Sequence, residues 1–478
     1  MNTIWFPDLS EGDAPKYQAL SDAIRAAIAS GQLAEGEKLP PVRELAWQLK
    51  VTPGTVARAY KVLVDAGVLR AEVGRGTFVA GPAPEPSAAA PVPAPAPQGG
   101  PAPLAAATAL DWPETVDLRS PKLPDCGQSA LMAEAMRALC AAPLPERYGR
   151  YPKHAGEAPA REAVRNWLST ADIGAFGAED IVLTHGGQNA ITLIFQTVLR
   201  GEAPVVFAEE LSYAGFRHAA RLARARIVSV ESDAEGIIPE ALHEAIHTHG
   251  GQLLCTSPEV HNPTLVQTTL ARRQELARVI SHHKLHVIED DCYRMGQGRL
   301  PGYRALIPEW AWYVSSLSKE LTPALRFGYA VAPKGWAERL RRALQHSSFG
   351  MAVPVADIAA AMLADPRARG VAQAVEARVD DYVRRAVNIL GGFDLRWRQD
   401  VPLIWLRLPR GWRASAFCVA AERSGVLVRS ADDFALIDGK APHAIRIAIN
   451  GQIAPERFEQ GLEALAALLA DPQDAIAV

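Results

Sequence analysis

The sequence predicts a small N-terminal helical module followed by a large α/β domain, and three observations support this fold class. Helix patterns and a short hairpin pattern fill the first eighty residues. A proline- and alanine-rich stretch follows, and strand-type and helix-type segments then alternate. The 478 residues are also too many for one ordinary hydrophobic core. We therefore expect a winged helix-turn-helix at 1–80, a linker at 81–107, and an α/β domain at 108–478 with a small α+β lobe from about 385.

Bulk composition excludes several classes of protein. The formal net charge is only −3 and 49% of the residues are hydrophobic, which is typical of a soluble globular chain without overall attraction to nucleic acid. The 5 cysteines are scattered and form no Cys-x-x-Cys pair, which indicates reduced thiols in a cytoplasmic protein. We find no signal-peptide pattern and no apolar run of about eighteen residues, so we expect no membrane partner.

Residues 17–80 contain three helix patterns and one hairpin pattern. Leu20, Ile24 and Ile28 recur on one face of the first helix, and Gly31 stops that helix. The run Val51–Thr55 is typical of the turn between the second and third helices. The expected helices are Tyr17–Ser30, Val42–Leu49 and Thr55–Ala66, and the expected strands are Val68–Ala71 and Thr77–Ala80.

This module is locally cationic although the whole chain is not. The segment Lys38–Arg75 holds seven basic and three acidic residues. Thr52 and Thr55 place hydroxyl and amide donors at the start of the third helix, where a DNA phosphate is favoured, and Arg58 lies on that helix. The third helix fits a major groove, and the hairpin tip can reach a neighbouring groove. The alternative is a packing module whose charges are solvated.

The stretch Gly81–Ala107 is the sharpest compositional break in the chain. It holds nine prolines, ten alanines and one charged residue, Glu85. Such a composition cannot bury enough apolar surface to fold, and proline keeps the chain extended at ~3.1 Å per residue. We interpret the stretch as a tether, since an ordered loop of this length inside one domain would be uncommon.

Beyond the linker, a βαβ rhythm predicts a mostly parallel sheet with helices on both faces, such as Asn189–Leu199 and Leu270–His282. Ligands of such sheets bind at the carboxyl ends of the strands. The small lobe has strand patterns at Leu403–Leu408 and Ala444–Ile449 and a helix from about Pro455. The expected strands of the large sheet are Ile181–Leu183, Val205–Ala208, Arg226–Val230, Gln252–Thr256, His286–Glu289, Trp312–Leu317 and Phe327–Ala332.

One short run, from Ser316 to Arg326, gathers an amine, a guanidinium and two hydroxyls. The amine of Lys319 can form an imine with an aldehyde if its pKa is lowered. Arg326 offers a planar fork for a phosphate, and Ser316 and Ser318 offer hydroxyl donors to the same group. Upstream, Gly187 lies in a glycine turn between a strand and a helix, where backbone N–H groups can approach a phosphate. The set suits a cofactor that carries both an aldehyde and a phosphate.

Further polar residues follow strand ends or lie on late strands. Asp290 ends an apolar strand and can keep a pyridinium nitrogen protonated, so that the ring acts as an electron sink. Asn262 and Tyr293 can hydrogen-bond a phenolate oxygen, and Tyr213 can stack on an aromatic ring. Arg446 can bind a carboxylate through both nitrogens of its fork. Each of these residues alone is weak evidence, because a lone polar residue is usually solvated or paired.

The run His243-Glu244-Ala-Ile-His247 spells the His-Glu-x-x-His zinc motif. The same segment carries Leu242 and Ile246 as an apolar stripe, which is typical of a helix that crosses between two strands. A catalytic zinc also needs a third ligand and an open cleft. We therefore expect no metal site here.

The N-terminal motifs resemble the winged-helix domain of GntR-type transcription regulators over the whole module. The matching runs begin at Lys38 (Lys-Leu-Pro-Pro-Val-Arg-Glu-Leu-Ala), Val51 (Val-Thr-Pro-Gly-Thr-Val-Ala-Arg-Ala-Tyr) and Gly74 (Gly-Arg-Gly-Thr-Phe-Val). Pro41 departs from the pattern, because the family usually has a serine there. The resemblance implies double-stranded DNA as a partner. It implies these DNA-facing positions: Arg43, Thr52, Thr55, Arg58 and Gly76.

From about Asp117 to Leu469 the chain resembles the fold-type I aminotransferases, which carry pyridoxal 5′-phosphate (PLP). The resemblance implies that Lys319 is the catalytic residue that forms the imine with PLP, and that Arg446 binds the α-carboxylate of an amino acid. Tyr151 matches a position that reaches the phosphate across a dimer interface. The implied cofactor-binding residues are Lys319, Gly187, Gln188, Tyr213, Asn262, Asp290, Tyr293, Ser316, Ser318, Arg326 and Tyr151.

Two residues depart from the aminotransferase pattern. Leu265 stands where the family usually has a glycine after Asn-Pro-Thr, which alters a turn near the ring oxygen and reshapes the space for substrate. His185 is unusual in the glycine turn. Neither departure removes a cofactor ligand.

The whole chain resembles the MocR subfamily of GntR regulators, in which a winged helix is joined to an aminotransferase-like domain. This resemblance implies a homodimeric transcription regulator that senses an amino compound, or PLP itself, through the PLP domain. A catalytically active aminotransferase with secondary DNA binding stays open as the alternative, because all the catalytic groups are present.

Overall fold

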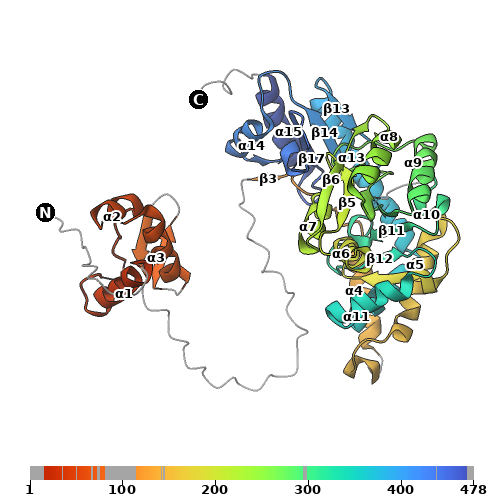
Figure 1. Cartoon of the computed structure of the whole chain (residues 1–478), viewed down its shortest axis with the longest axis horizontal. Helices are drawn as coiled ribbons and strands as arrows, with labels where there is room; N and C mark the ends of the chain where they lie inside the picture. The colour runs from red at the N-terminus through yellow and green to blue at the C-terminus, as the bar shows by residue number, and fades with distance from the viewer. Residues whose placement is uncertain are drawn as a thin grey trace. The chain divides into compact units, whose positions relative to one another are not determined.

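The structure is a computed structural model of the chain. It describes residues 16–34, 36–49, 51–65, 68–72, 76–80, 115–141, 143, 146–293, 299–437 and 439–470. The chain divides into two compact units, Met1–Ala105 and Ala106–Val478 (Figure 1). The expected linker at 81–107 and the tip of the expected hairpin lie outside the described residues.

The N-terminal unit contains three helices and a two-stranded antiparallel sheet within its described residues. Leu20 and Ile24 of α1 are fully buried, and they pack with Val56 and Leu63 of α3 in one core. The third helix begins at Pro53, two residues earlier than expected, because proline is well suited to the first turn of a helix. The elements are α1 (Lys16–Ala29), α2 (Val42–Gln48), α3 (Pro53–Asp65), β1 (Leu69–Glu72) and β2 (Gly76–Val79).

The large unit is built on a seven-stranded sheet with the strand order β4-β12-β11-β10-β9-β5-β6. Strand β12 runs antiparallel to both of its neighbours, whereas the other pairings are parallel. The mostly parallel sheet is therefore confirmed. Its strands are β4 (Ile181–Thr184), β5 (Val205–Glu209), β6 (Arg226–Val230), β9 (Leu253–Thr256), β10 (His286–Asp290), β11 (Ala311–Ser316) and β12 (Gly328–Val331).

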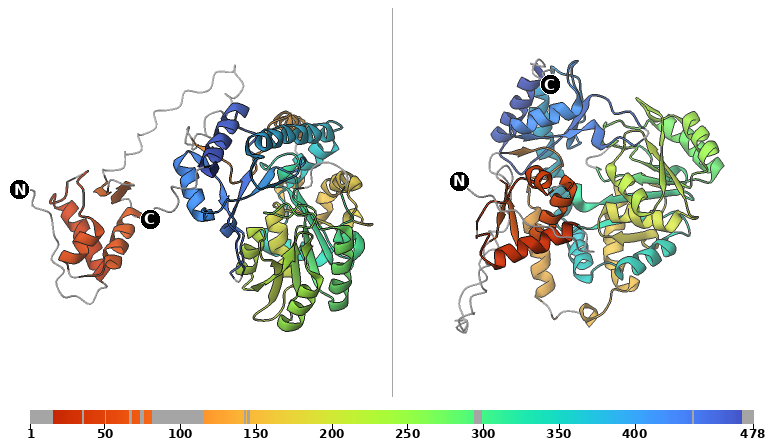
Figure 2. Two further views of the ribbon diagram at one scale, coloured as in Figure 1. Left: turned by 90° about the horizontal axis from the view of Figure 1, so that it is seen from above. Right: turned by 60° about the vertical axis from the view of Figure 1, so that its left-hand side comes forward.

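Helices cover both faces of this sheet, as the two further views in Figure 2 show. One face packs against α6 (Gly187–Val198), α7 (Ala214–Leu222) and α11 (Ala337–Ser348). The other face packs against two groups of helices. The helices α8 (Pro239–His249), α9 (Leu270–His283) and α10 (Tyr303–Leu306) cover the part around β5, β9 and β10. The helices α4 (Gln128–Cys140), α5 (Ala158–Trp167) and α12 (Val353–Ala364) cover the part around β4 and β12. Because both faces are buried, the strands read as continuous apolar runs.

The small lobe is a four-stranded sheet with the order β13-β14-β17-β16, packed on helices. The short strand β3 (Val116–Asp117) pairs with β15 (Val426–Leu427), so the first strand of the unit lies against the small lobe. The sheet strands are β13 (Leu395–Trp397), β14 (Leu403–Arg407), β16 (Arg429–Ser430) and β17 (Ala444–Ala448). The helices are α13 (Ala368–Leu390), α14 (Ala414–Arg423) and α15 (Pro455–Ala470). In the described part of the chain, no helix has the length and apolar character needed to cross a bilayer.

Candidate functional site

The carboxyl ends of the central strands bring most of the expected cofactor-binding residues to one edge of the sheet. Asp290 is the last residue of β10, and Ser316 is the last residue of β11. Lys319 follows in a short 3-10 turn, Leu317–Lys319. Strand β4 leads through a glycine turn into α6, which begins at Gly187. These elements are far apart in the sequence, and the sheet places their ends together.

Lys319 is a largely buried amine with one described hydrogen bond. Its Nζ donates to the carbonyl oxygen of Pro121 at 3.2 Å. Burial lowers the pKa of the amine to about 8, and the positive charges of Arg446 and Arg326 add to this effect. At pH 7, about a tenth of the amine is therefore unprotonated and nucleophilic, far more than for a lysine of ordinary pKa, and imine formation requires this unprotonated form.

Asp290 is a buried carboxyl group that faces the site from the end of β10. Its Oδ1 accepts a hydrogen bond from the backbone N–H of Cys292 at 3.3 Å. Burial raises the pKa of Asp290 to about 6. A cationic ring nitrogen brought next to this carboxyl would stabilise its ionised form, and the carboxylate would in turn keep that nitrogen protonated.

The glycine turn before α6 forms a narrow cradle. Gly186 has a φ of 87°, which favours glycine, and an added Cβ there would lie 2.7 Å from Nη2 of Arg326. Nη1 of Arg326 donates to Oγ of Ser318 at 3.4 Å. Gly328 must also lack a side chain, because an added Cβ would lie 2.5 Å from the carbonyl carbon of Gly186. A guanidinium, a hydroxyl and the N-terminus of a helix thus converge on one spot, which is suited to a phosphate.

Arg446 and Asn262 contact each other across the site. Nη1 of Arg446 donates to Oδ1 of Asn262 at 2.7 Å, and Nη2 donates to the carbonyl oxygen of Arg119 at 2.6 Å. The guanidinium lies over the ring of Phe434, 4.7 Å from its centroid. Arg446 Nε is buried and has no hydrogen-bond partner. Burial lowers the pKa of Arg446, so an anionic ligand would be favoured beside it.

Tyr213 and Gln188 lie together at the start of α7. Tyr213 is the residue before that helix, and burial raises the pKa of its phenol. Nε2 of Gln188 donates to the carbonyl oxygen of Gly215 at 3.0 Å, while its Oε1 is buried without a hydrogen-bond partner. Tyr293 is half-buried, and burial raises its pKa to about 12. Both phenols therefore stay protonated and able to donate near neutral pH.

Tyr151 does not join this group within the described chain. Its side chain is 75% exposed and lies 5.1 Å from the ring of Phe349, measured between centroids. Phe349 is itself exposed. The structure thus leaves Tyr151 on the surface, away from the group at the strand ends.

Leu265, which departs from the family's glycine, has a φ of 60°. This left-handed conformation costs a residue with a side chain roughly 1–2 kcal/mol and explains why glycine is usual there. The Leu265 side chain is buried with Val260, Leu403 and Trp405 between the large domain and the small lobe. Full burial of a leucine stabilises by roughly 1.5–3 kcal/mol, which offsets the strain.

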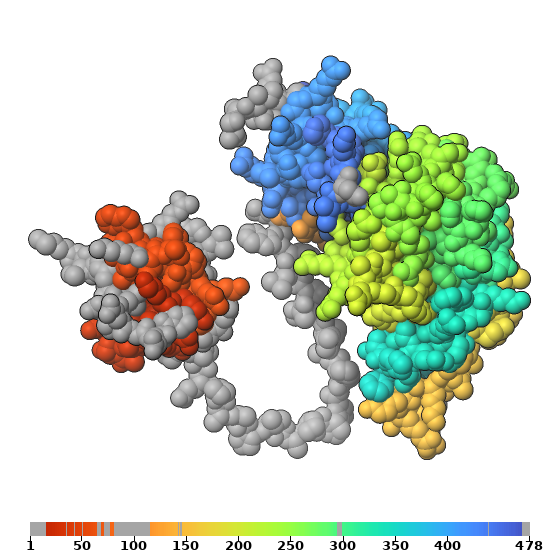
Figure 3. All heavy atoms as spheres, viewed as in Figure 1, coloured from red at the N-terminus to blue at the C-terminus, as the bar shows by residue number. Residues whose placement is uncertain are grey.

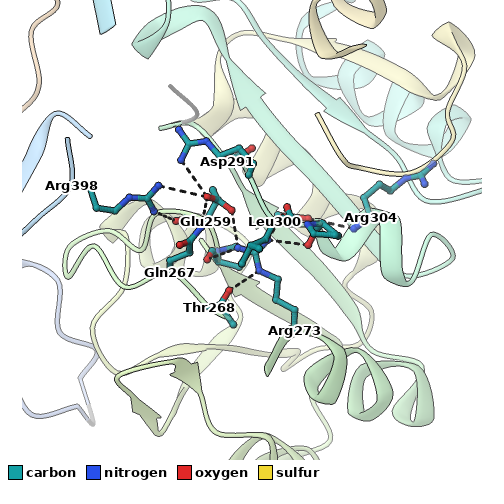
Figure 4. A network of polar contacts seen from close by, with 12 residues as sticks. Glu259, Gln267, Thr268, Arg273, Asp291, Leu300, Arg304 and Arg398 are labelled. Atoms are coloured by element: carbon teal, nitrogen blue, oxygen red, sulfur yellow. Dashed lines mark hydrogen bonds and ion pairs between the residues drawn. The ribbon is translucent and has the colours of Figure 1, made fainter. Parts of the chain in front are cut away.

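A buried ionic network supports the loop that carries Asn262 (Figure 4). Glu259 accepts from Arg273 Nη2 at 2.9 Å, from Gln267 Nε2 at 2.7 Å and from Arg299 Nη1 at 3.3 Å. Arg398 of the small lobe donates to the backbone carbonyl of Glu259 at 2.7 Å. The opposing charges hold the pKa of Glu259 below its usual range despite its burial. The network thereby links the small lobe to the large domain beside the site.

Two contacts of the site were not expected from the sequence. Cys292 lies between the glycine turn and β11, because an added Cβ on Gly187 would lie 2.7 Å from its Sγ, and Ser316 Oγ lies 3.9 Å from the same sulfur. The sequence could have indicated Cys292, because it lies between Asp290 and Tyr293, which are both expected at the site. The carbonyl of Arg119 binds Arg446 from 327 residues away, and nothing in the sequence indicates that pairing.

The zinc-type motif lies on α8, where Leu242 and Ile246 are buried as expected. His243 and His247 are exposed. His243 Nδ1 lies 3.0 Å from Nε2 of His283 on α9. Among the described residues, no group of three or more His, Cys, Asp or Glu side chains is arranged to hold a metal ion.

In the N-terminal unit, the expected DNA-facing residues lie on three elements, and two of them, Thr52 and Thr55, lie at the start of α3. Thr52 Oγ1 accepts from the backbone N–H of Thr55 at 3.3 Å and lies 2.9 Å from Thr55 Oγ1. Arg58 is exposed, and its guanidinium lies 4.2 Å from the centroid of the Tyr17 ring. Gly76 begins β2 opposite Glu72. Arg43 is in the first turn of α2, and its side chain lies outside the described part.

Comparison with known families agrees with the division of the chain into an N-terminal unit and a large unit. Residues 113–465 match the family aminotransferase class I and II. Residues 16–79 match the bacterial regulatory proteins of the gntR family. The first match covers well over half of the chain, so the chain belongs to that family, and the second confirms a GntR-type helix-turn-helix before it.

Several named proteins share the same layout or the same large domain. The HTH-type transcriptional regulator YdeF of Bacillus subtilis is 27% identical over 98% of this chain and 97% of its own length. The vitamin B6 salvage pathway transcriptional repressor PtsJ of Salmonella typhimurium is 27% identical over 92% of this chain and 95% of its own. Among solved structures, the α-aminoadipate aminotransferase LysN of Thermus thermophilus has a TM-score of 0.65 and 23% identity, covering 75% of this chain and 92% of its own.

The cofactor of this family is pyridoxal 5′-phosphate, and the residues present fit it. The glycine cradle leaves no room for side chains beside Arg326, a buried amine stands at Lys319, and a buried carboxyl stands at Asp290. Gln188 Oε1 and Arg446 Nε are buried polar atoms without partners, as expected in a pocket that a polar ligand completes. The chain therefore belongs to the MocR-type regulators, in which a GntR helix-turn-helix is fused to a PLP-binding aminotransferase class I and II domain.

Proposed function

We propose that this protein is a cytoplasmic, homodimeric transcription regulator whose affinity for its DNA operator changes when an amino compound reaches the cofactor site. The observation that carries the proposal is the buried amine of Lys319, with a pKa of about 8, in a chain that also carries a DNA-binding domain. When bound, PLP supplies an aldehyde that a primary amine can capture and a ring that draws electrons from it.

The chain's own residues support an amino compound that carries a carboxylate. Arg446 presents a buried guanidinium to the site, and one of its nitrogens has no hydrogen-bond partner. A carboxylate would have to compete with Asn262 Oδ1 and the Arg119 carbonyl for the same fork. Such an exchange would move the Asn262 loop and the segment of Arg119, and this movement is the proposed origin of the conformational signal.

A dimer is supported by the exposed aromatic residues Tyr151 and Phe349, whose rings contact each other. Large exposed aromatic side chains of this kind are typical of protein interfaces. In the proposed dimer, Tyr151 of one protomer reaches the phosphate site of its partner. Two DNA-binding units would then be joined, and simultaneous engagement of two half-sites would raise operator affinity.

Within this proposal, the DNA is bound through the start of α3 and through the wing, which is the β1–β2 hairpin. The residues assigned to that contact are Arg43, Thr52, Thr55, Arg58 and Gly76. The N-terminus of α3 favours a phosphate, and exposed Arg58 supplies a positive charge one turn further on.

A second candidate function is multiple-turnover transamination, because all the residues assigned to PLP are present in the aminotransferase domain. One experiment separates the two candidates. Purified full-length protein, loaded with PLP, is incubated with a panel of amino acids and an excess of 2-oxoglutarate, and the keto-acid product is counted per site. The proposed regulator yields no more than about one equivalent, together with a shifted cofactor absorption band and a changed operator affinity. Linear product formation over many equivalents, with operator affinity unchanged, would contradict it.

A further inference from the structure

A second cavity lies between the large domain and the small lobe, apart from the site of Lys319. Its volume is about 650 Å³, within the range of pockets that bind small metabolites. The large domain contributes the end of β5, the β7–β8 hairpin (Ser232–Ile237) and the loop around His261, and the small lobe contributes β13 and β14. Neither Lys319 nor Arg446 lines it. Figure 3 shows these two parts, yellow-green and blue, packed against each other.

Two arginines on neighbouring strands mark the small-lobe wall. Arg396 on β13 pairs directly with Trp405 on β14, and Arg407 is two residues further along that strand. Side chains at such positions share one face of a sheet and lie within reach of each other. Both arginines are exposed, and within the described residues neither side chain forms an ion pair. Two such guanidiniums can bind one oxyanion from two sides.

The other charges along the cavity leave this pair available. Lys440 adds a third cation to the lining. Asp233 is already paired with Arg272, at 2.9 Å between Oδ2 and Nη2. Glu209, Glu210 and Asp394 are the remaining acidic residues of the lining, and Glu209 is buried in the inner wall. Among the outer lining residues, three cations therefore stand against the two carboxylates of Glu210 and Asp394. The arrangement favours a ligand with a negative head group.

The inner wall is polar but carries little charge. Glu209 is 4% exposed, and its Oε1 accepts from Thr256 Oγ1 at 2.5 Å, whereas its Oε2 is buried with no hydrogen-bond partner. His261 Nδ1 lies 2.6 Å from Thr264 Oγ1, and the buried ring also interacts with the backbone of Leu211. Burial raises the pKa of Glu209 to about 7 and lowers that of His261 to about 4. This wall therefore offers polar groups with little charge at neutral pH, which suits an uncharged polar part of a ligand.

We propose that this cavity is a second ligand site, which binds a small metabolite with an oxyanion head group and an uncharged polar body. The head group lies between Arg396 and Arg407. The body reaches inward to the polar wall that Glu209 and His261 help to form. Since His261 directly precedes Asn262, this second site and the cofactor site share one loop.

The test uses full-length protein saturated with PLP, so that the phosphate of the cofactor already occupies the glycine cradle. Glycerol 3-phosphate and glycerate serve as probes of the two head groups, since both carry an uncharged hydroxylated body, and titration calorimetry measures their binding. We expect saturable binding of at least one probe, and the better probe decides between phosphate and carboxylate. The double variant Arg396→Ala/Arg407→Ala should bind that probe at least tenfold more weakly.

The matched control is Arg410→Ala/Arg423→Ala, which removes two exposed arginines of the same lobe that do not line the cavity. This variant should bind the probe as the unaltered protein does, and thermal unfolding should show that both double variants fold. A third variant, Glu209→Gln, keeps the shape of the inner wall and tests the body of the ligand, with a several-fold change expected. The proposal is overturned if neither probe shows saturable binding, or if the two double variants bind equally well.

Discussion

The cofactor site and the DNA-binding surface hold their functional side chains in different ways. Asp290 and Arg446 are buried, and Lys319 is largely so. Lys319 and Arg446 each contact the backbone of a remote segment, and Asp290 contacts the backbone of Cys292. Thr52 and Arg58 are exposed, and their described contacts are confined to Thr55 and the ring of Tyr17. A substitution in the cofactor site therefore changes the pKa values of its neighbours, the packing around it and the reactivity of the site together. A substitution on the DNA-binding surface should change little except the affinity for DNA.

The largest expected effect is that of Lys319→Ala, which should abolish the visible absorption band of the protein with PLP. The substitution removes the buried amine and cannot be compensated by another described side chain in the cradle. Absorption spectroscopy of the purified protein with added PLP measures this. Lys334→Ala, which removes an exposed lysine, is the control and should keep the band. A band that survives Lys319→Ala would show that the amine is elsewhere.

The buried network beside the cofactor site gives the next largest effect. Glu259→Gln keeps the shape of the side chain but leaves Arg273 as a buried cation without its carboxylate partner, whereas Arg299 keeps its ion pair with Asp400. We expect a loss of about 3–5 kcal/mol in the free energy of unfolding, measured with urea. Glu235→Gln breaks only an exposed ion pair with Arg272 and should cost less than about 1 kcal/mol. Equal losses of unfolding free energy for the two variants would contradict the expectation that the buried ion pair matters more than the exposed one.

The depressed pKa of Lys319 predicts a specific pH dependence. The amine must be unprotonated to react, and a pKa of about 8 means that its reactive fraction rises about tenfold between pH 7 and pH 9 and then levels off. The rate at which the absorption band forms after PLP is added should follow this curve. A lysine with the ordinary pKa of 10.5 would instead give a rate that keeps rising beyond pH 9, and such a profile would contradict the burial argument.

The smallest expected effect is that of Arg58→Ala on the DNA-binding surface. One phosphate contact should be lost, so operator affinity should fall several-fold and the slope of log affinity against log salt should decrease by about 1. Fluorescence anisotropy with labelled operator DNA measures both. The absorption band should be unchanged, and Arg25→Ala, which removes another exposed arginine of the same unit, is the control. An equal effect of the two substitutions would mean that α3 is not the recognition helix.

Much of the fold could be predicted because its strands are buried on both faces. Strands β4, β5, β9, β10, β11 and β12 are buried along their whole length, so they appear in the sequence as short apolar runs. Sequence patterns do not encode which strands become neighbours. The insertion of antiparallel β12 between β11 and β4, and the pairing of β3 with β15, depend on contacts between distant segments.

The cofactor site could be predicted in part for a similar reason. Lys319, Asp290 and Gly187 stand at strand ends or turns that local patterns locate. Several contacts of the site come from remote segments instead, as with the carbonyl of Pro121 on Lys319 and the carbonyl of Arg119 on Arg446. The lowered pKa of Lys319 is a consequence of burial, which no local run of residues determines. The strained backbone at Leu265 is a further example, because the residue type alone suggests ordinary core packing.

The most direct test of the central proposal is the operator affinity of the full-length protein, measured by anisotropy with PLP present and with or without an amino acid. The amino acid is one that shifts the cofactor's absorption band. The proposal predicts that this compound changes operator affinity by about fivefold or more in the unaltered protein and has no effect in Lys319→Ala, whose helix-turn-helix is intact. Identical operator affinities with and without the compound in the unaltered protein would contradict it.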